Sequence, residues 1–163
     1  MTDMAIGFEN LTAQEYQKLI HSVAWVALLI AGADGKIDSE EITWASKIAK
    51  IRSYANPDEL TEFYQDVATD FEEYFKSIIE NSPKETKSRT AIASDKLSEL
   101  NTILPKLPPY IAYSIYKSFQ SFATHVAKAS GGFLRMWSIS HEEDKYVKLP
   151  MLEEVPFAEK PEE

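Results

Sequence analysis

The chain has 163 residues, of which 44% are hydrophobic and 12% aromatic, so it is long enough and apolar enough to build one domain around a core. Its 17 basic residues stand against 26 acidic ones, and the resulting net charge of −9 repels the phosphates of nucleic acids. The sequence contains no cysteine, which excludes disulfides, zinc–thiolate sites, thiol nucleophiles and iron–sulfur clusters. We therefore expect a single domain that does not bind nucleic acid.

Membrane-spanning and export segments are not predicted. The most apolar run, residues 23–31, is far shorter than the about 20 residues that a membrane-spanning helix needs. Residues 1–10 lack the basic and apolar regions of a signal peptide. We expect a cytoplasmic protein without a transmembrane segment.

Helix signals recur along the chain. Thr12 with Glu15, and Asp38 with Glu41, have the spacing of a capping box, in which each side chain satisfies a backbone N–H at the helix start. Apolar residues then recur at the helical period. Helices are predicted over residues 12–32, 39–53, 57–80, 83–104, 109–129 and 141–149. The short connections indicate an all-α fold, a compact helical bundle of about six or seven helices.

The predicted domain covers residues 12–150, after an N-terminal segment of residues 1–11. Residues 151–163 contain five acids against one lysine, together with two prolines. A segment of this composition buries little apolar surface, so we expect a flexible acidic tail.

An internal similarity suggests that the bundle has two pseudo-repeated halves. Residues 26–35 align without gaps with residues 122–131, and each copy leads through an isoleucine into an acidic helix start. The matching positions are Ala27, Ala31, Ala33 and Gly35 in the first copy, and Ala123, Ala127, Ala129 and Gly131 in the second.

At residues 31–41 (AGADGKIDSEE) and 127–143 (AKASGGFLRMWSISHEE) the chain resembles the TerB-like family, which is named after tellurite-resistance proteins and also occurs fused to J-domain cochaperones. The resemblance spans roughly residues 12–150. It implies an all-α bundle of two pseudo-equivalent halves, a non-enzymatic stress-response role, and divalent-metal binding by the acidic residues of the first motif. The second copy departs from this pattern, because Ser130 stands where the first has Asp34.

The acidic turn at residues 34–41 resembles the back half of an EF-hand loop, but the first and third ligand positions have no side-chain oxygen. High-affinity EF-hand binding is therefore excluded by the number of ligands. Two interpretations stay open: a weak Ca²⁺ or Mg²⁺ site, or a helix start at which Asp38 is the N-cap and Glu41 completes the capping box. The candidate metal ligands are Asp34, Asp38, Glu40 and Glu41.

No enzymatic motif is found in the sequence. The three histidines, at positions 21, 125 and 141, lack the glutamate three residues earlier that a di-metal bundle site requires. Motifs of serine hydrolases, zinc proteases and phosphate-binding loops are also missing from the sequence. We expect a protein that is not an enzyme.

Residues 131–137 (GGFLRMW) place four large apolar side chains between two predicted helices. These side chains either plug one end of the bundle or stay exposed to a partner protein or a membrane surface. The candidate partner-binding residues are Phe133, Leu134, Met136 and Trp137. The sequence thus predicts a TerB-like stress-response interaction module that a divalent cation tunes; the alternative is a small metal or ligand sensor whose occupancy is the signal.

Overall fold

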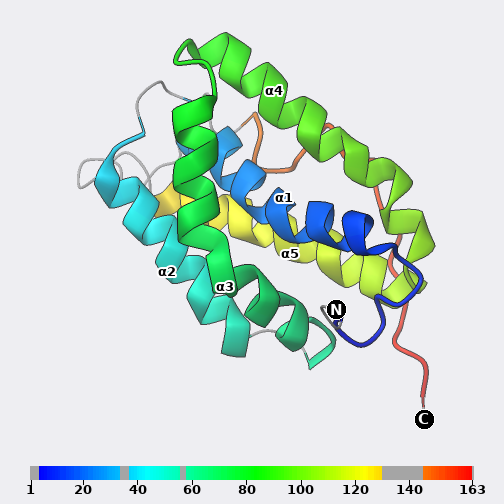
Figure 1. Cartoon of the computed structure of the whole chain (residues 1–163). Helices are drawn as coiled ribbons and strands as arrows, with labels where there is room; N and C mark the ends of the chain where they lie inside the picture. Colours follow the sequence, from blue (N-terminus) through cyan, green and yellow to red (C-terminus); the bar gives the residue numbers. More distant parts are fainter. Residues whose placement is uncertain (1–3, 34–36, 56–57, 130–144, 163) are drawn as a thin grey trace.

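The computed structural model describes residues 4–33, 37–55, 58–129 and 145–162, and over these residues the regular structure is entirely helical. Figure 1 shows how the helices are arranged. The elements are α1 (Ala13–Ala31), α2 (Ser39–Ala55), α3 (Asp58–Asn81), α4 (Thr86–Ser98), the 3-10 helices η1 (Glu99–Thr102) and η2 (Leu104–Lys106), and α5 (Pro109–Ala129). The prediction of an all-α fold is confirmed.

Helix α1 is the central element of the bundle. It contacts α3, α4 and α5, while α2 packs on α3 and α5. In Figure 1, α1 and α5 lie between the α2–α3 pair and α4. Residues 26–31 of α1 are all buried because this half of the helix is apolar on every side. A helix of this kind is stable only when other helices surround it.

The start of α1 agrees with the prediction from the sequence, whereas the start of α4 does not. The Glu15 N–H donates to the Thr12 hydroxyl at 3.1 Å, and the Thr12 N–H donates to the Glu15 carboxylate at 2.9 Å, so this capping box is confirmed. The predicted helix over residues 83–104 was too long at both ends. Its α-helical part begins at Thr86 after an N-cap, Glu85, whose side chain makes no capping hydrogen bond, and beyond Ser98 the chain tightens into η1 and η2.

The number of helices also differs from the prediction. The described residues form five α-helices rather than six or seven. Residues 145–149, which were predicted to belong to a helix over 141–149, form turns, and 141–144 lie outside the described residues.

Both ends of the chain pack against the body. In the N-terminal segment Phe8 is fully buried and stacks on Phe63 with ring centroids 5.3 Å apart. At the other end Leu149 and Leu152 are buried, and residues 151–158 run beside η1, η2 and the start of α5; we call this segment the C-terminal strap (Figure 1). The acidic composition predicted a flexible tail and gave no indication of this packing.

Helix α3 bends at Asp70, whose φ of −133° and ψ of 16° are not helical. The two parts of α3 consequently point in different directions (Figure 1). The sequence predicted one continuous helix, since neither glycine nor proline occurs near this position. Among the described residues, no helix has both the length and the apolar character that crossing a membrane requires.

Candidate functional site

The acidic turn that was predicted to bind a metal is described in part. Asp38 Oδ1 accepts a hydrogen bond of 2.8 Å from the Glu41 N–H, which is the geometry of an N-cap. The charge of Glu41 acts on Arg89 of α4: burial lowers the pKa of Arg89, and the nearby carboxylate opposes this change. Glu40 lies in the first turn of α2, and Asp34 lies outside the described residues.

Within the part of the chain that the structure describes, no three histidine, cysteine or acidic residues come together as a metal site. The Ca²⁺ or Mg²⁺ site therefore stays a prediction that depends on Asp34. The four predicted partner-binding residues, Phe133, Leu134, Met136 and Trp137, lie outside the described residues as well.

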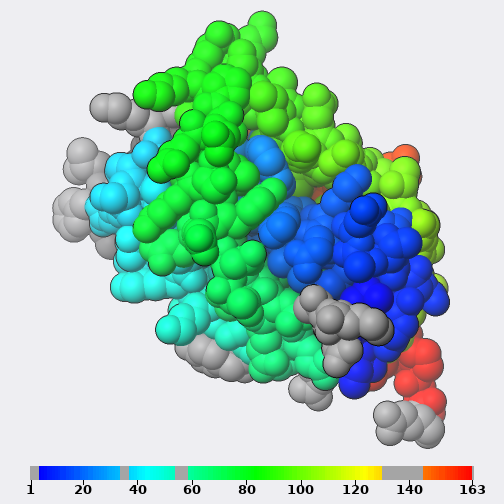
Figure 2. All heavy atoms as spheres, in the orientation of Figure 1, coloured from blue at the N-terminus to red at the C-terminus, as the bar shows by residue number. Residues whose placement is uncertain are grey.

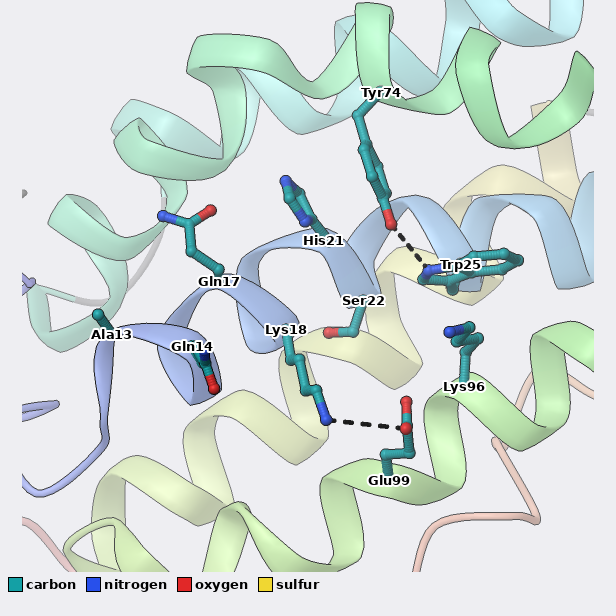
Figure 3. Close-up of a pocket in the computed structure, with 10 residues that line it drawn as sticks. All are labelled: Ala13, Gln14, Gln17, Lys18, His21, Ser22, Trp25, Tyr74, Lys96 and Glu99. Atoms are coloured by element: carbon teal, nitrogen blue, oxygen red, sulfur yellow. Dashed lines mark hydrogen bonds and ion pairs between the residues drawn. The ribbon is translucent and has the colours of Figure 1, made fainter. Parts of the chain in front are cut away.

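A groove between α1, α3 and α4 combines polar and aromatic side chains. It has a volume of about 420 Å³, and Figure 3 shows ten of the residues that line it. We call it the α1–α4 groove. Figure 2 shows the blue surface of α1 exposed between the green surfaces of α3 and α4. Its volume falls in the range of about 300–1,000 Å³ that ligand pockets occupy.

Three aromatic side chains form one wall of the groove. His21 stacks on Tyr74 with ring centroids 3.8 Å apart and an angle of 10° between the planes. The Trp25 indole Nε1–H donates to the Tyr74 hydroxyl oxygen at 3.2 Å. His21 also lies 3.6 Å from the carboxylate of Asp70, at the bend of α3. The bend and the stack together hold Tyr74 over α1 (Figure 3).

The Tyr74 hydroxyl is arranged to donate a hydrogen bond into the groove. Burial raises the pKa of this hydroxyl, and the hydrogen bond from Trp25 only partly offsets the effect, so the hydroxyl is protonated at neutral pH. Since its oxygen already accepts from Trp25, its own proton remains to be donated to an acceptor.

Two lysines also line the groove, and one of them contacts the aromatic wall. Lys96 Nζ lies 6.0 Å from the centre of the Trp25 ring, which is the distance of a cation–π contact. Lys18 Nζ lies 3.8 Å from a carboxylate oxygen of Glu99, and both side chains are about half exposed. Such a surface ion pair is weak and exchanges easily for another carboxylate.

The groove has a serine and a histidine on its lining, Ser22 and His21. Ser22, its only lining hydroxyl besides Tyr74 among the described residues, donates to the carbonyl oxygen of Leu19 at 2.5 Å. In Figure 3 the side chains of Ser22 and His21 point in different directions, so they do not form a nucleophile–base pair. The arrangement offers aromatic rings beside hydrogen-bond donors and ammonium groups.

No family model, no curated protein and no solved structure matches the chain. The interpretation of the groove therefore depends on its own residues.

This groove was not predicted from the sequence. Its signal was available at His21 and Trp25, which are four residues apart and thus lie on one face of α1. They are half-buried positions in a helix that is otherwise buried from Leu19 to its end. Tyr74 lies on α3, one turn after the bend at Asp70, and its stacking on His21 is a contact between two helices that are distant in the sequence.

Proposed function

We propose that this protein is a non-enzymatic, TerB-like interaction module whose α1–α4 groove binds a segment of a partner protein that carries an aromatic side chain next to a carboxylate. The observation that carries the proposal is the aromatic wall of His21, Tyr74 and Trp25, with the Lys96 ammonium over the Trp25 ring and Lys18 lining the same groove. An aromatic side chain would stack on this wall, and a carboxylate would accept from Tyr74 and from the lysines.

The charges of the groove favour such a partner over a basic one. The protein as a whole is acidic, with a net charge of −9, but among the described lining residues Lys18 and Lys96 stand against Glu99, while the Asp70 carboxylate lies 3.6 Å from His21. A carboxylate that enters the groove would replace Glu99 as the partner of Lys18. Because these charges are exposed, the interaction should weaken as salt is added.

The TerB-like part of the proposal is supported by the all-helical fold and by the alanines that match between the two sequence copies. Ala27 and Ala31 of α1 are buried, as are Ala123 and Ala127 of α5, and the two helices contact each other. A stress-response role follows from the resemblance, and the divalent cation at the acidic turn is an additional prediction of it.

The proposal is tested with a library of displayed random peptides selected on the wild-type protein. We expect the enriched peptides to share an aromatic residue within two positions of Asp or Glu. Their Kd should rise about tenfold in the K18Q/K96Q double variant and change by less than about twofold in K76Q/K117Q, which removes two lysines outside the groove.

Two results would contradict the proposal. The first is enrichment of peptides without an acidic residue. The second is equal affinity of the enriched acidic peptides for the wild-type protein and for K18Q/K96Q, because the carboxylate would then be recognised elsewhere.

A further inference from the structure

A second pocket, separate from the α1–α4 groove, lies beneath the C-terminal strap. It has a volume of about 380 Å³ and opens between the strap and the corner at which η2 leads into α5. Leu104, Leu107 and Ala112 line it from the body, and Val155 and Phe157 line it from the strap. We call it the strap pocket.

The strap is fixed to the body at the near end of this pocket. Asn101 in η1 donates from Nδ2 to the carbonyl oxygen of Met151 at 2.9 Å and accepts from the Glu153 N–H at 2.8 Å. Leu152, between these two bonds, is buried. Beyond Glu153 the strap continues without helix or strand along the pocket, and in Figure 2 its red end is visible at the edge of the molecule. The pocket therefore has one wall made of extended chain.

Apolar surfaces face this pocket without filling it. Phe157 lines this pocket but is 68% exposed. Its ring meets the ring of Tyr113 edge-on, with the centroids 5.3 Å apart. Protein interiors normally close such gaps, because atoms that border a void lose their packing contacts. An exposed aromatic ring beside an unfilled apolar pocket is the arrangement that an additional apolar group would complete.

The charges at the pocket select the kind of group. Glu153 and Glu154 are the charged residues that line it in the described part of the chain, and both are exposed. Two carboxylates at the rim of an apolar pocket attract a cation and repel an anion. The volume is near the lower end of the range of about 300–1,000 Å³ for ligand pockets, which suits a small molecule.

We propose that the strap pocket binds a small organic cation, an ammonium group on an apolar body, with the apolar part against Leu104, Leu107 and Ala112 and the ammonium at Glu153 and Glu154. The ligand would replace the missing packing between the strap and the body. This site shares no lining residue with the α1–α4 groove, so either proposal can fail without the other.

The test uses three probes with the same eight-carbon chain: octyltrimethylammonium, octyl sulfate and octanol. Each is titrated below its micelle concentration into the full-length ¹⁵N-labelled protein, and the backbone amides are followed by NMR. We expect saturable shifts at residues 101–112 and 153–158. The ammonium probe should bind about fivefold to tenfold more tightly than the sulfate, with octanol between them.

Two double variants and one truncation distinguish the contribution of the charges to binding from that of the pocket itself. In E153Q/E154Q, the Kd values of the ammonium and sulfate probes should come to within about twofold of each other, and octanol binding should be unchanged. The control E159Q/E162Q makes the same charge change further along the tail and should behave as the wild-type protein. Truncation after Pro150 removes the strap wall and should abolish saturable binding of all three probes. Far-UV circular dichroism of each variant is measured to check that the helices are retained.

The proposal is overturned if no probe shifts the pocket amides, or if the shifts cluster outside residues 101–112 and 153–158. Equal affinity of the wild-type protein for octyltrimethylammonium and octyl sulfate would also overturn it, since the two carboxylates would then play no part in binding.

Discussion

Arg89 of α4 donates a hydrogen bond of 2.7 Å from its guanidinium Nη2 to the carbonyl oxygen of Gly32, the residue at which α1 ends. Carbonyl groups at a helix end have no partner within the helix, and a cation there also interacts favourably with the helix dipole. Arg89 is 7% exposed, so the bond is shielded from water. It ties α4 to the end of α1, next to the point at which α2 begins.

Replacement of Gly32 by alanine should destabilise the protein by about 1–3 kcal/mol, the usual cost of adding an atom to a packed site. The added Cβ would lie 2.7 Å from the Leu28 carbonyl oxygen and 2.8 Å from Arg89 Nε, which is too close for both. Urea unfolding measures the loss. The double variant G32A/R89M removes one of the two clashes, so its loss should be smaller than the sum of the single losses. A neutral or stabilising G32A would show that this corner relaxes freely.

Substitutions at Asp38 distinguish its two interpretations. As an N-cap that accepts from the Glu41 N–H, Asp38 should be replaceable by asparagine or serine, whereas alanine should cost about 0.5–2 kcal/mol of stability. The measurement is the unfolding free energy of each variant, in chelator and in millimolar Ca²⁺ or Mg²⁺. A capping role predicts the same ranking in all three solutions. If D38S and D38A were equally destabilised, and only in the presence of metal, the result would instead support a metal ligand at this position.

Much of the fold follows from local patterns, and the remainder depends on contacts between distant residues. Thr12 and Glu15 cap α1 because both partners are within one turn, so their spacing alone predicted the bond. The burial of Phe8 could not be predicted in this way, since it requires Phe63 of a different helix. The same holds for the strap, which Asn101 fixes across some fifty positions of sequence.

The candidate groove also depends partly on a local pattern and partly on contacts between distant residues. The spacing of His21 and Trp25 is readable from the sequence as one face of α1. That Tyr74 completes this face depends on the bend at Asp70, for which the surrounding sequence has no helix-breaking residue. Periodicity places a residue on a face, but it does not say where a bent helix brings that face.

Loss of the Asn101 side chain should release the strap. The N101A variant removes the hydrogen bonds to Met151 and Glu153, and we expect amide exchange of residues 151–158 to accelerate while exchange in α1 and α5 changes little. Global stability should fall by about 1–3 kcal/mol for the two bonds together. N81A serves as the control, because Asn81 donates only to Ser77 one turn earlier on the exposed end of α3. Unchanged exchange at Glu153 in N101A would show that apolar packing alone holds the strap.

The contact between α2 and α5 should make the protein sensitive to mild acid. Arg52 Nη2 lies 3.0 Å from His125 Nδ1, and since a guanidinium can only donate, this nitrogen must be the unprotonated acceptor of a neutral imidazole. Burial lowers the pKa of His125, and the charges of Arg52 and Lys128 lower it further. The unfolded chain, with a histidine pKa of about 6.5, therefore takes up the proton at a higher pH than the folded protein does.

It follows that His125 contributes stability that is present above about pH 6.5 and is lost as the pH falls through its lower folded pKa. Urea unfolding at pH 7.5 and at pH 5.5 should show a decrease for the wild-type protein that is smaller in H125N, in which the amide oxygen can accept from Arg52 without titrating. If H125N loses as much stability as the wild-type protein over this interval, protonation of His125 is not the cause.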